Sequence, residues 1–583
     1  MAAAMSFSPK SDACSNILVT KGASADGSCM ISYAADSHAL YGELYYSPAA
    51  SWPSGTMLPV TEWDTGRYLG DIPQVGMTYK TVGNMNEHQL IIGETTYGGR
   101  HGLDDTTGKM DYGSLIYIAL QRARTAREAI SVIIDLANTY GYCSEGESFS
   151  IADKDEVWVM DLIGKGTQLD ENGNNLRRGI VYVARRVPDG YICAHANQAR
   201  ISTFPQNDPE NCIFAPDVVS FAREMGWYDG KDEDFSFCDT YAPLDFGGMR
   251  ACEARAWSAF NILCDGKFTY EDENGRTVTA DAYDYIDYAM GYDSSKRFPL
   301  FVKPSRKLTV KDVADAMRDH FEGTPMDMTT DIGAGGNALP YRWRPMGFEY
   351  DGKTYVNERA IATQQTGFWF VAQSRGNYPD EIGGLLWFGT DDAATSYLTP
   401  IYACATRVPE CFRVGNGNMI TYSPTSAFWM CNRVANACYR MYNVMAPTVR
   451  AAIDEWENAQ IEAVRRIDAE AMRMYAEADA MPRKQIARND AKKKIFDPFV
   501  KVKEFLTDYS VNSAQEIFDK WTALETLLLV KYIDGNVKAQ NEDGSFVTNP
   551  YTDNIPAKIS NPGYTEKWKA CVAADHGTVL EER

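Results

Sequence analysis

The 583-residue sequence lacks the motifs of a zinc site and of a membrane span. Its six histidines form no HExxH pattern, and no cysteine–histidine cluster has zinc-finger spacing. No apolar run reaches the roughly 18 residues that a membrane-spanning helix needs. The 13 cysteines are odd in number and form no CxxC pair, which favours free thiols over a disulfide framework. We therefore expect no metal site and no membrane span.

Basic residues are outnumbered by acidic ones. The chain has 57 lysines and arginines against 79 aspartates and glutamates, a formal net charge of −22. A nucleic-acid-binding protein needs a basic surface, so this balance argues against that class. An acidic cleft attracts cationic groups such as the amino terminus of a peptide, although solubility is the simpler explanation for most of this charge.

Residues 1–13, MAAAMSFSPKSDA, contain one lysine and no apolar core of roughly 7 to 15 residues, which is not typical of a signal peptide. We expect a short leader or propeptide here and a cytoplasmic protein. The alternative is that this stretch is the remnant of a trimmed export signal, and the protein is then periplasmic or extracellular.

The first third of the chain predicts strands around one helical block. Residues 16–20 and 30–33 are β-prone and are separated by turn residues, which predicts a hairpin. Residues 114–141 have helical periodicity, and Thr125 and Glu128 form a T-x-x-E capping box that divides this block into two helices. Strands, a helix pair and strands again indicate an α+β fold with the helices on one side.

The rest of the chain changes character twice. Residues 200–445 are rich in Trp, Tyr, Gly and Pro and predict packed, irregular structure. From Pro447 onward apolar residues follow a helical period with charges between them, and further helices are predicted over 483–507 and 513–533. The predicted division is a leader (1–13), a main domain (14–445) and a helical C-terminal region (446–583).

Cys14 stands directly before the first predicted strand. A thiolate is a strong nucleophile, but a free cysteine has a pKa of about 8.5 and needs a base. If the Ala13–Cys14 bond is cut, the new α-amino group of Cys14, with a pKa of about 7.7–8.0, is such a base on the same residue. The alternative is a small buried strand residue, the usual environment of a free cysteine.

The run CSNILVTKGASADGS, which begins at Cys14, resembles the mature start of the cysteine N-terminal-nucleophile (Ntn) dipeptidases, a family related to the secernins. Similar blocks follow in the same order over about residues 14 to 445. They are SYAADSH (32–38), GNMNEHQLIIGETTYGGR (83–100), RTAREAISVI (124–133), SIADKDEVWVMD (150–161), ANQARI (196–201), MRACEARAWSAF (249–260), KRFPLFVKP (296–304), RDHFEGTPMDMT (318–329) and ATQQTGFWFVAQSR (362–375).

The resemblance implies an α+β fold, an Ntn-hydrolase αββα sandwich with a C-terminal helical extension. It implies a dipeptidase that forms an acyl-enzyme on a cysteine and needs no metal or organic cofactor. Dipeptides are the expected partners, with no nucleic acid and a possible homo-oligomer. The leader is removed by the protein itself or by another protease.

The same resemblance implies roles for individual residues. Cys14 is the nucleophile, and Asp36 is the aspartate that holds its amine in place. Tyr33 stands where many relatives have an arginine, and its hydroxyl remains a hydrogen-bond donor. Asn197 corresponds to an asparagine that orients the nucleophile or the oxyanion. Turn-forming roles are the alternative for Asp36 and Asn197.

Two further positions are less closely fixed by the resemblance. Thr95 or Thr96 stands where the superfamily places an oxyanion or substrate contact, and a plain strand threonine is the alternative. Arg297 matches an arginine near the nucleophile, with a surface ion pair as the alternative. His320 is expected in a structural or substrate-loop position. Candidates for binding the charged ends of a dipeptide are Asp36, Arg250, Glu253 and Arg344.

Two other functions stay open at this point. One keeps the chemistry but takes N-acyl amides as substrates, as acylases of the superfamily do. The other is a secernin-like interaction protein in which the cysteine is never unmasked.

Overall fold

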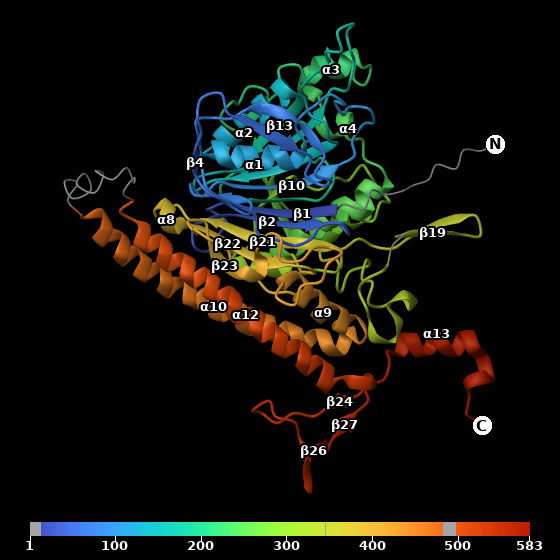
Figure 1. Ribbon diagram of the computed structural model, residues 1–583. Helices are drawn as coiled ribbons and strands as arrows, with labels where there is room; N and C mark the ends of the chain where they lie inside the picture. Colours follow the sequence, from blue (N-terminus) through green and yellow to red (C-terminus); the bar gives the residue numbers. More distant parts are fainter. Residues whose placement is uncertain (1–12, 344–345, 482–496, 583) are drawn as a thin grey trace. The chain divides into compact units, whose positions relative to one another are not determined.

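The computed structural model describes residues 13–343, 346–481 and 497–582 (Figure 1). It mixes helices and sheets, which confirms the α+β class. The chain forms two compact units. Unit 1 contains the described residues up to Ala314 together with 365–386 and 402–404, and unit 2 contains 315–364, 387–401 and the described residues from Ala405 onward. Unit 2 takes residues from both sides of 445, so the domain boundary there stays a prediction, and residues 1–12 of the predicted leader lie outside the described residues.

The predicted hairpin is present at the centre of unit 1. Strands β1 (Ala13–Val19) and β2 (Cys29–Asp36) are antiparallel, with Cys14 opposite Ala35. Their neighbours in the sheet are β14 (Ile192–His195), next to β1, and β21 (Thr366–Ser374), next to β2. The short β18 (Phe301–Val302) pairs with β14. Because the hairpin lies between other strands, Cys14 starts on a central strand.

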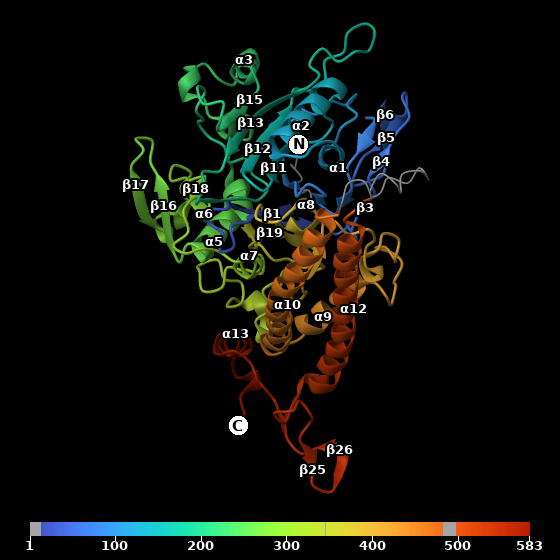
Figure 2. The same cartoon turned by 90° about the vertical axis from the view of Figure 1, so that its left-hand side faces the viewer.

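A second sheet in unit 1 has eight strands. Its order is β15 (Cys212–Phe214), β13 (Ile180–Arg186), β12 (Val157–Gly164), β11 (Gly146–Ala152), β10 (Ile91–Tyr97), β9 (Met85–Asn86), β8 (Thr81–Val82) and β3 (Tyr46–Ser47) (Figure 2). The two sheets pack face to face near Gly93 of β10. A Cβ there would lie 3.0 Å from the amide of Asn16 and 3.4 Å from the side chain of Ile31. This close approach brings β10 against the hairpin beside Cys14.

Two helices cover the outer face of the eight-stranded sheet (Figure 1). They are α1 (Tyr112–Arg122) and α2 (Ala126–Tyr140). The Thr125 hydroxyl accepts from the backbone N–H of Glu128 at 3.2 Å, and Gly141 ends α2 with a φ of 81°. The predicted helix boundary is thereby confirmed. On the other sheet, α5 (Ala254–Leu263) contacts β1 and β14.

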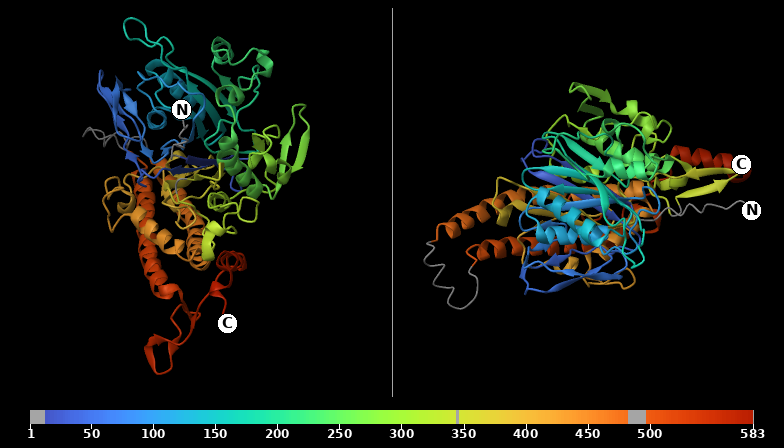
Figure 3. Two further views of the ribbon diagram at one scale, coloured as in Figure 1. Left: turned by 90° about the vertical axis from the view of Figure 1, so that its right-hand side faces the viewer. Right: turned by 90° about the horizontal axis from the view of Figure 1, so that it is seen from above.

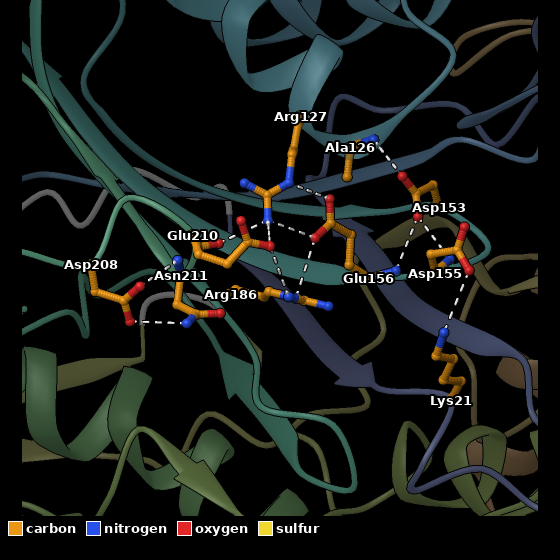
Figure 4. Close-up of polar contacts among 10 residues, drawn as sticks. All are labelled: Lys21, Ala126, Arg127, Asp153, Asp155, Glu156, Arg186, Asp208, Glu210 and Asn211. Atoms are coloured by element: carbon orange, nitrogen blue, oxygen red, sulfur yellow. Dashed lines mark hydrogen bonds and ion pairs between the residues drawn. The ribbon is translucent and has the colours of Figure 1, made fainter.

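Ion pairs fasten the first turn of α2 to the sheet beneath it (Figure 4). Arg127 bonds Glu156 at 2.8 Å and Glu210 at 3.1 Å, and Arg186 at the end of β13 bonds Glu156 at 3.2 Å. Asp153 accepts from the N–H that begins α2 at 2.9 Å, which suits the positive end of a helix. Charge pairing therefore fixes the helix layer at this end.

Unit 1 also contains shorter elements. They are β4 (Ala50–Ser51), β5 (Met57–Thr61), β6 (Tyr68–Pro73), β7 (Met77–Thr78), α3 (Val218–Glu224), α4 (Phe237–Tyr241), β16 (Lys267–Glu271), β17 (Thr277–Asp281), α6 (Ile286–Ala289) and α8 (Asp380–Gly383). Three elements have residues in both units: α7 (Val310–Ala316), β22 (Gly384–Thr390) and β23 (Thr399–Tyr402).

Unit 2 is mainly helical. Its principal helices, α9 (Ala427–Tyr439), α10 (Tyr442–Asp479) and α12 (Val500–Lys531), pack against one another (Figures 2 and 3). The predicted helices over 483–507 and 513–533 are one continuous helix from 500 to 531, and residues 482–496 lie outside the described residues. The other elements are β19 (Gly347–Tyr350), β20 (Lys353–Val356), β24 (Val537–Lys538), β25 (Thr548–Asn549), β26 (Thr552–Pro556), β27 (Ile559–Ser560) and α13 (Glu566–His576). Across the described part of the chain, no helix combines the length and apolar character that crossing a bilayer requires.

Candidate active site

The backbone of Cys14 is held by two side chains from distant parts of the sequence. Its N–H donates to Oδ1 of Asn197 at 2.8 Å, and its carbonyl accepts from Nη1 of Arg255 at 2.6 Å. The Arg255 guanidinium also donates to Asn197 Oδ1 and to Ser15 Oγ, both at 2.9 Å. Arg255 is only 2% exposed, and its bonds to the Cys14 carbonyl and to Ser15 are buried. Cys14 and Arg255 are buried, Asn197 is half-buried, and the three form one hydrogen-bonded group.

The backbone conformation at Asn197 is one that favours asparagine. It follows β14 with a φ of 53°, a left-handed conformation that asparagine tolerates better than most residues. Its Nδ2 donates to the carbonyl of Thr96 in β10 at 2.6 Å. Asn197 thus connects Cys14 with the second sheet, and its side-chain oxygen faces the Cys14 nitrogen.

The Cys14 thiol faces a carboxylate and a phenol. Its Sγ lies 3.5 Å from Oε1 of Glu94 and 3.8 Å from the hydroxyl of Tyr33, which itself donates to Glu94. Burial, followed by the charges of Glu94 and Asp36, raises the pKa of the Cys14 thiol well above its ordinary value. The hydrogen bonds that the thiolate would accept from the Asp36 backbone and from Tyr33 only partly oppose this. The thiol is therefore neutral near pH 7.

Glu94 has a second buried carboxyl beside it. Glu147 of β11 shares a hydrogen bond with Glu94 and accepts from the Thr96 hydroxyl at 2.9 Å. Burial raises the pKa of both carboxyls, and the charge of Glu94 and their shared hydrogen bond raise that of Glu147 further. The pKa of Glu147 is raised the more strongly of the two, so Glu147 is the carboxyl that favours the protonated form, whose proton can be shared with Glu94.

Asp36 ends β2 beside Ala13 and Cys14. It lies opposite Ala13 in the β1–β2 register, and its Oδ1 accepts from the Thr366 hydroxyl at 2.6 Å. Its backbone bonds the Cys14 sulfur, and its carboxylate is one of the charges that raise the Cys14 pKa. Asp36 is thus adjacent to both Ala13 and Cys14.

The two threonines of β10 point to other partners. Thr95 bonds Nδ1 of His195 at 2.7 Å, and Ser150 bonds its Nε2 at 2.7 Å. Burial and the Arg200 charge lower the pKa of His195 to about 3, so this imidazole is neutral. The Thr96 hydroxyl donates to the Glu147 carboxyl. The Thr96 backbone carbonyl accepts from the Asn197 amide, and this is its link to Cys14.

The structure places Arg297 in a different cluster from Cys14. Its guanidinium pairs with Asp239 at 2.6 Å, and its Nε bonds the hydroxyl of Tyr288 at 3.3 Å. The guanidinium that bonds the Cys14 carbonyl belongs to Arg255 instead, because α5 packs against β1 and β14.

The model of peptidase family C69 matches residues 13–455 of the chain. The chain belongs to peptidase family C69. The resemblance stated from the sequence is thereby confirmed, and the protein is a peptidase by family.

Several bacterial relatives are similar to this C69 chain over most of its length. A "Probable dipeptidase" of Latilactobacillus sakei is 24% identical over 77% of this chain and 87% of its own length. A "Probable dipeptidase" of Salmonella dublin is 24% identical over 67% and 81%. A "Probable dipeptidase A" of Streptococcus pyogenes serotype M3 is 24% identical over 73% and 82%.

Other candidate residues of this C69 chain lie elsewhere or are occupied. Glu253 forms a buried ion pair with Arg200 at 3.0 Å, and Arg250 donates to a backbone carbonyl at 2.9 Å. His320 belongs to unit 2, and Arg344 lies outside the described residues. Within the described ranges, no group of three or more His, Cys, Asp and Glu side chains is placed to hold a metal ion.

Sequence reasoning missed two residues of this site. Glu94 stands in the block GETTYGGR, and Arg255 stands in MRACEARAWSAF. Glu94 directly follows the apolar run LIIG, and Arg255 directly precedes the mostly apolar run AWSAF. A charged residue beside such a run is rarely buried without a partner. That pattern was the available signal.

Proposed function

We propose that this C69 chain is a cysteine dipeptidase whose nucleophile is the Cys14 thiol. The observation that carries the proposal is the fixation of Cys14 by Asn197 and Arg255, with its thiol on Tyr33 and Glu94. The relatives named as dipeptidases support the substrate class. The base is the α-amine of Cys14, which a cut at Ala13–Cys14 sets free.

The proposed reaction has two steps. The Cys14 amine takes the thiol proton, and the thiolate attacks the carbonyl carbon of the dipeptide. The C-terminal amino acid leaves after its nitrogen receives that proton, and water then hydrolyses the thioester on Cys14. Asn197 Oδ1, 2.8 Å from the Cys14 nitrogen, orients the amine, and Arg255 fixes the Cys14 carbonyl. Asp36 adds a negative charge that favours the protonated amine.

The layers of unit 1 support the Ntn-hydrolase αββα sandwich, which we propose as its fold. Helices α1 and α2 pack on one sheet, the two sheets pack on each other near Gly93, and α5 packs on the other sheet. In this arrangement the start of β1 lies between the sheets, where the nucleophile is shielded from water.

The test is hydrolysis of unblocked dipeptides by the purified chain and by Cys14→Ala. Amino-acid release is expected from the wild type and is expected to fall at least about 1000-fold in Cys14→Ala. Cys143→Ala is the matched control, because Cys143 is also a free thiol of unit 1. Undiminished release by Cys14→Ala would refute the proposal. Hydrolysis of N-acylated substrates alone would favour the acylase alternative. If neither dipeptides nor N-acylated substrates are hydrolysed, the interaction-protein alternative is favoured.

A further inference from the structure

In the joined chain, the Cys14 thiol lies against a buried carboxylate. Sγ is 3.5 Å from Oε1 of Glu94, on a chain that continues through the Ala13–Cys14 peptide bond. We propose that Glu94 is the base that takes the Cys14 thiol proton when the protein cuts its own Ala13–Cys14 bond. This inference rests on the proposed function, which requires that cut.

The joined chain needs a base other than the one that serves dipeptide hydrolysis. Before the cut, the Cys14 nitrogen belongs to an amide, whose lone pair is delocalised into the carbonyl and cannot accept the proton. The nearby imidazole of His195 is engaged by Thr95 and Ser150 at 2.7 Å each. Glu94 is the group that contacts the sulfur and can accept a proton.

The surroundings of Glu94 hold its carboxylate on the thiol. Tyr33 donates to the same oxygen, Oε1, that faces Sγ, and protonated Glu147 bonds the carboxylate from β11. Glu94 is 1% exposed, so water does not compete for its oxygens. Burial also raises the pKa of Glu94, which makes it a stronger proton acceptor than an exposed glutamate.

The cut then proceeds with atoms in balance. The thiol proton moves to Glu94, the sulfur bonds the Ala13 carbonyl carbon, and the carbonyl electron pair moves to oxygen in a five-membered ring. Glu94 returns the proton to the Cys14 nitrogen, the carbonyl re-forms and the C–N bond breaks, which leaves the preceding chain as a thioester on Sγ. Water hydrolyses this thioester, giving a carboxylate on Ala13 and a free thiol and amine on Cys14. Asn197 Oδ1 lies 2.8 Å from the nitrogen and accepts a hydrogen bond from the amine as it forms.

The test follows the cut directly by intact mass. The full chain is made in a cell-free reaction, sampled over time and compared with Glu94→Gln, Glu147→Gln and Glu210→Gln. Glu94→Gln keeps an oxygen for the Tyr33 hydroxyl but cannot take the proton, and its cut is expected to slow at least about 100-fold. In Glu147→Gln the side-chain amide still donates to Glu94, and the rate of the cut is expected to stay within about tenfold of wild type. Glu210→Gln changes an exposed ion pair and is the matched control.

A shortened form of the chain separates this role from a structural one. A chain that begins Met–Cys14 exposes Cys14 when the host removes the methionine, so it needs no cut. In this form the loss of dipeptide hydrolysis by Glu94→Gln is expected to be at least about tenfold smaller than the slowing of its cut, because the free Cys14 amine takes the thiol proton during hydrolysis. An equal loss of cutting and of dipeptide hydrolysis in Glu94→Gln, or cutting of the full chain at the wild-type rate, would overturn the inference.

The remaining outcomes are also decisive. A pure wild-type chain that is never cut would overturn the inference, and dipeptide hydrolysis by the Met–Cys14 form would leave the proposed function standing. If Glu94→Gln does not fold, Glu94→Asp takes its place, because its carboxylate is one methylene further from Sγ. It is expected to cut at least about tenfold more slowly, and cutting at the wild-type rate would overturn the inference.

Discussion

Replacing Arg255 with lysine tests the hydrogen-bonded group around Cys14. Arg255 donates hydrogen bonds of 2.6–2.9 Å to the Cys14 carbonyl, Ser15 Oγ, Asn197 Oδ1 and the Ala251 carbonyl. Lysine keeps the positive charge but has a single nitrogen, whereas the planar guanidinium uses three nitrogens at once. The ammonium therefore cannot hold both the Cys14 carbonyl and Asn197 in their present geometry.

The size of the effect follows from the bonds that are lost. A hydrogen bond to a charged group contributes about 1.5–3 kcal/mol. Losing two of them costs about 3–6 kcal/mol, and each 1.4 kcal/mol is tenfold, so kcat/KM is expected to fall about 100- to 10,000-fold if the loss falls on the transition state. A smaller fall in kcat/KM, together with a lowered melting temperature of Arg255→Lys, would show that part of the lost hydrogen-bond energy reduces the stability of the fold.

The assay is kcat/KM for an unblocked dipeptide, together with thermal unfolding of Arg255→Lys. Arg297→Lys is the matched comparison, because Arg297 is also a paired arginine of unit 1 but bonds Asp239 and Tyr288. It is expected to stay within about threefold of wild type. Wild-type kcat/KM in Arg255→Lys, or a greater loss in Arg297→Lys than in Arg255→Lys, would show that Arg255 does not hold Cys14 for catalysis.

Two predictions concern the stability of unit 1. Burial opposes ionisation of Asp380, but hydrogen bonds from His88 and Lys154 and the Lys154 charge lower its pKa to about 2. The ionised carboxylate therefore stabilises the folded state above the pKa that Asp380 has in the unfolded chain, and this stabilisation is lost as pH falls towards 2. Asp380→Asn should lower the free energy of urea unfolding by about 2 kcal/mol at pH 7 and by almost nothing near pH 2. An equal cost at both pH values would contradict this. Gly146→Ala would drive a Cβ into the ring of Tyr97, whose hydroxyl is bonded to a backbone carbonyl of β12, and should cost about 1–3 kcal/mol of unfolding free energy. An unchanged urea midpoint in Gly146→Ala would show that the ring moves freely.

Local patterns in the sequence were enough to predict several elements. The turn residues between residues 20 and 28 predicted the β1–β2 hairpin, and Thr125 with Glu128 predicted the start of α2. These features depend on neighbouring residues only, so a single sequence contains the information. The position of Cys14 at the beginning of a strand was predicted in the same way.

The partners of Cys14 depend on contacts between distant residues. Glu94 is 80 positions away from Cys14 and Arg255 is 241 positions away, and no periodicity links such positions. The run that contains β13 and β14 likewise does not tell from sequence which sheet each strand joins. It reads as two strands with a polar turn between them, yet β13 belongs to the eight-stranded sheet and β14 pairs with β1. That crossing between sheets is what brings Asn197 to Cys14, and it is decided by tertiary packing.

Acylation of an N-terminal Cys14 during turnover can be followed by the mass of the peptide that begins at Cys14. The enzyme is mixed with a dipeptide, quenched in acid and digested. We expect the active protein to begin at Cys14 and this peptide to gain the mass of the N-terminal aminoacyl group of the substrate. An active protein that keeps residues before Cys14, or an acyl group found on another residue, would contradict this expectation.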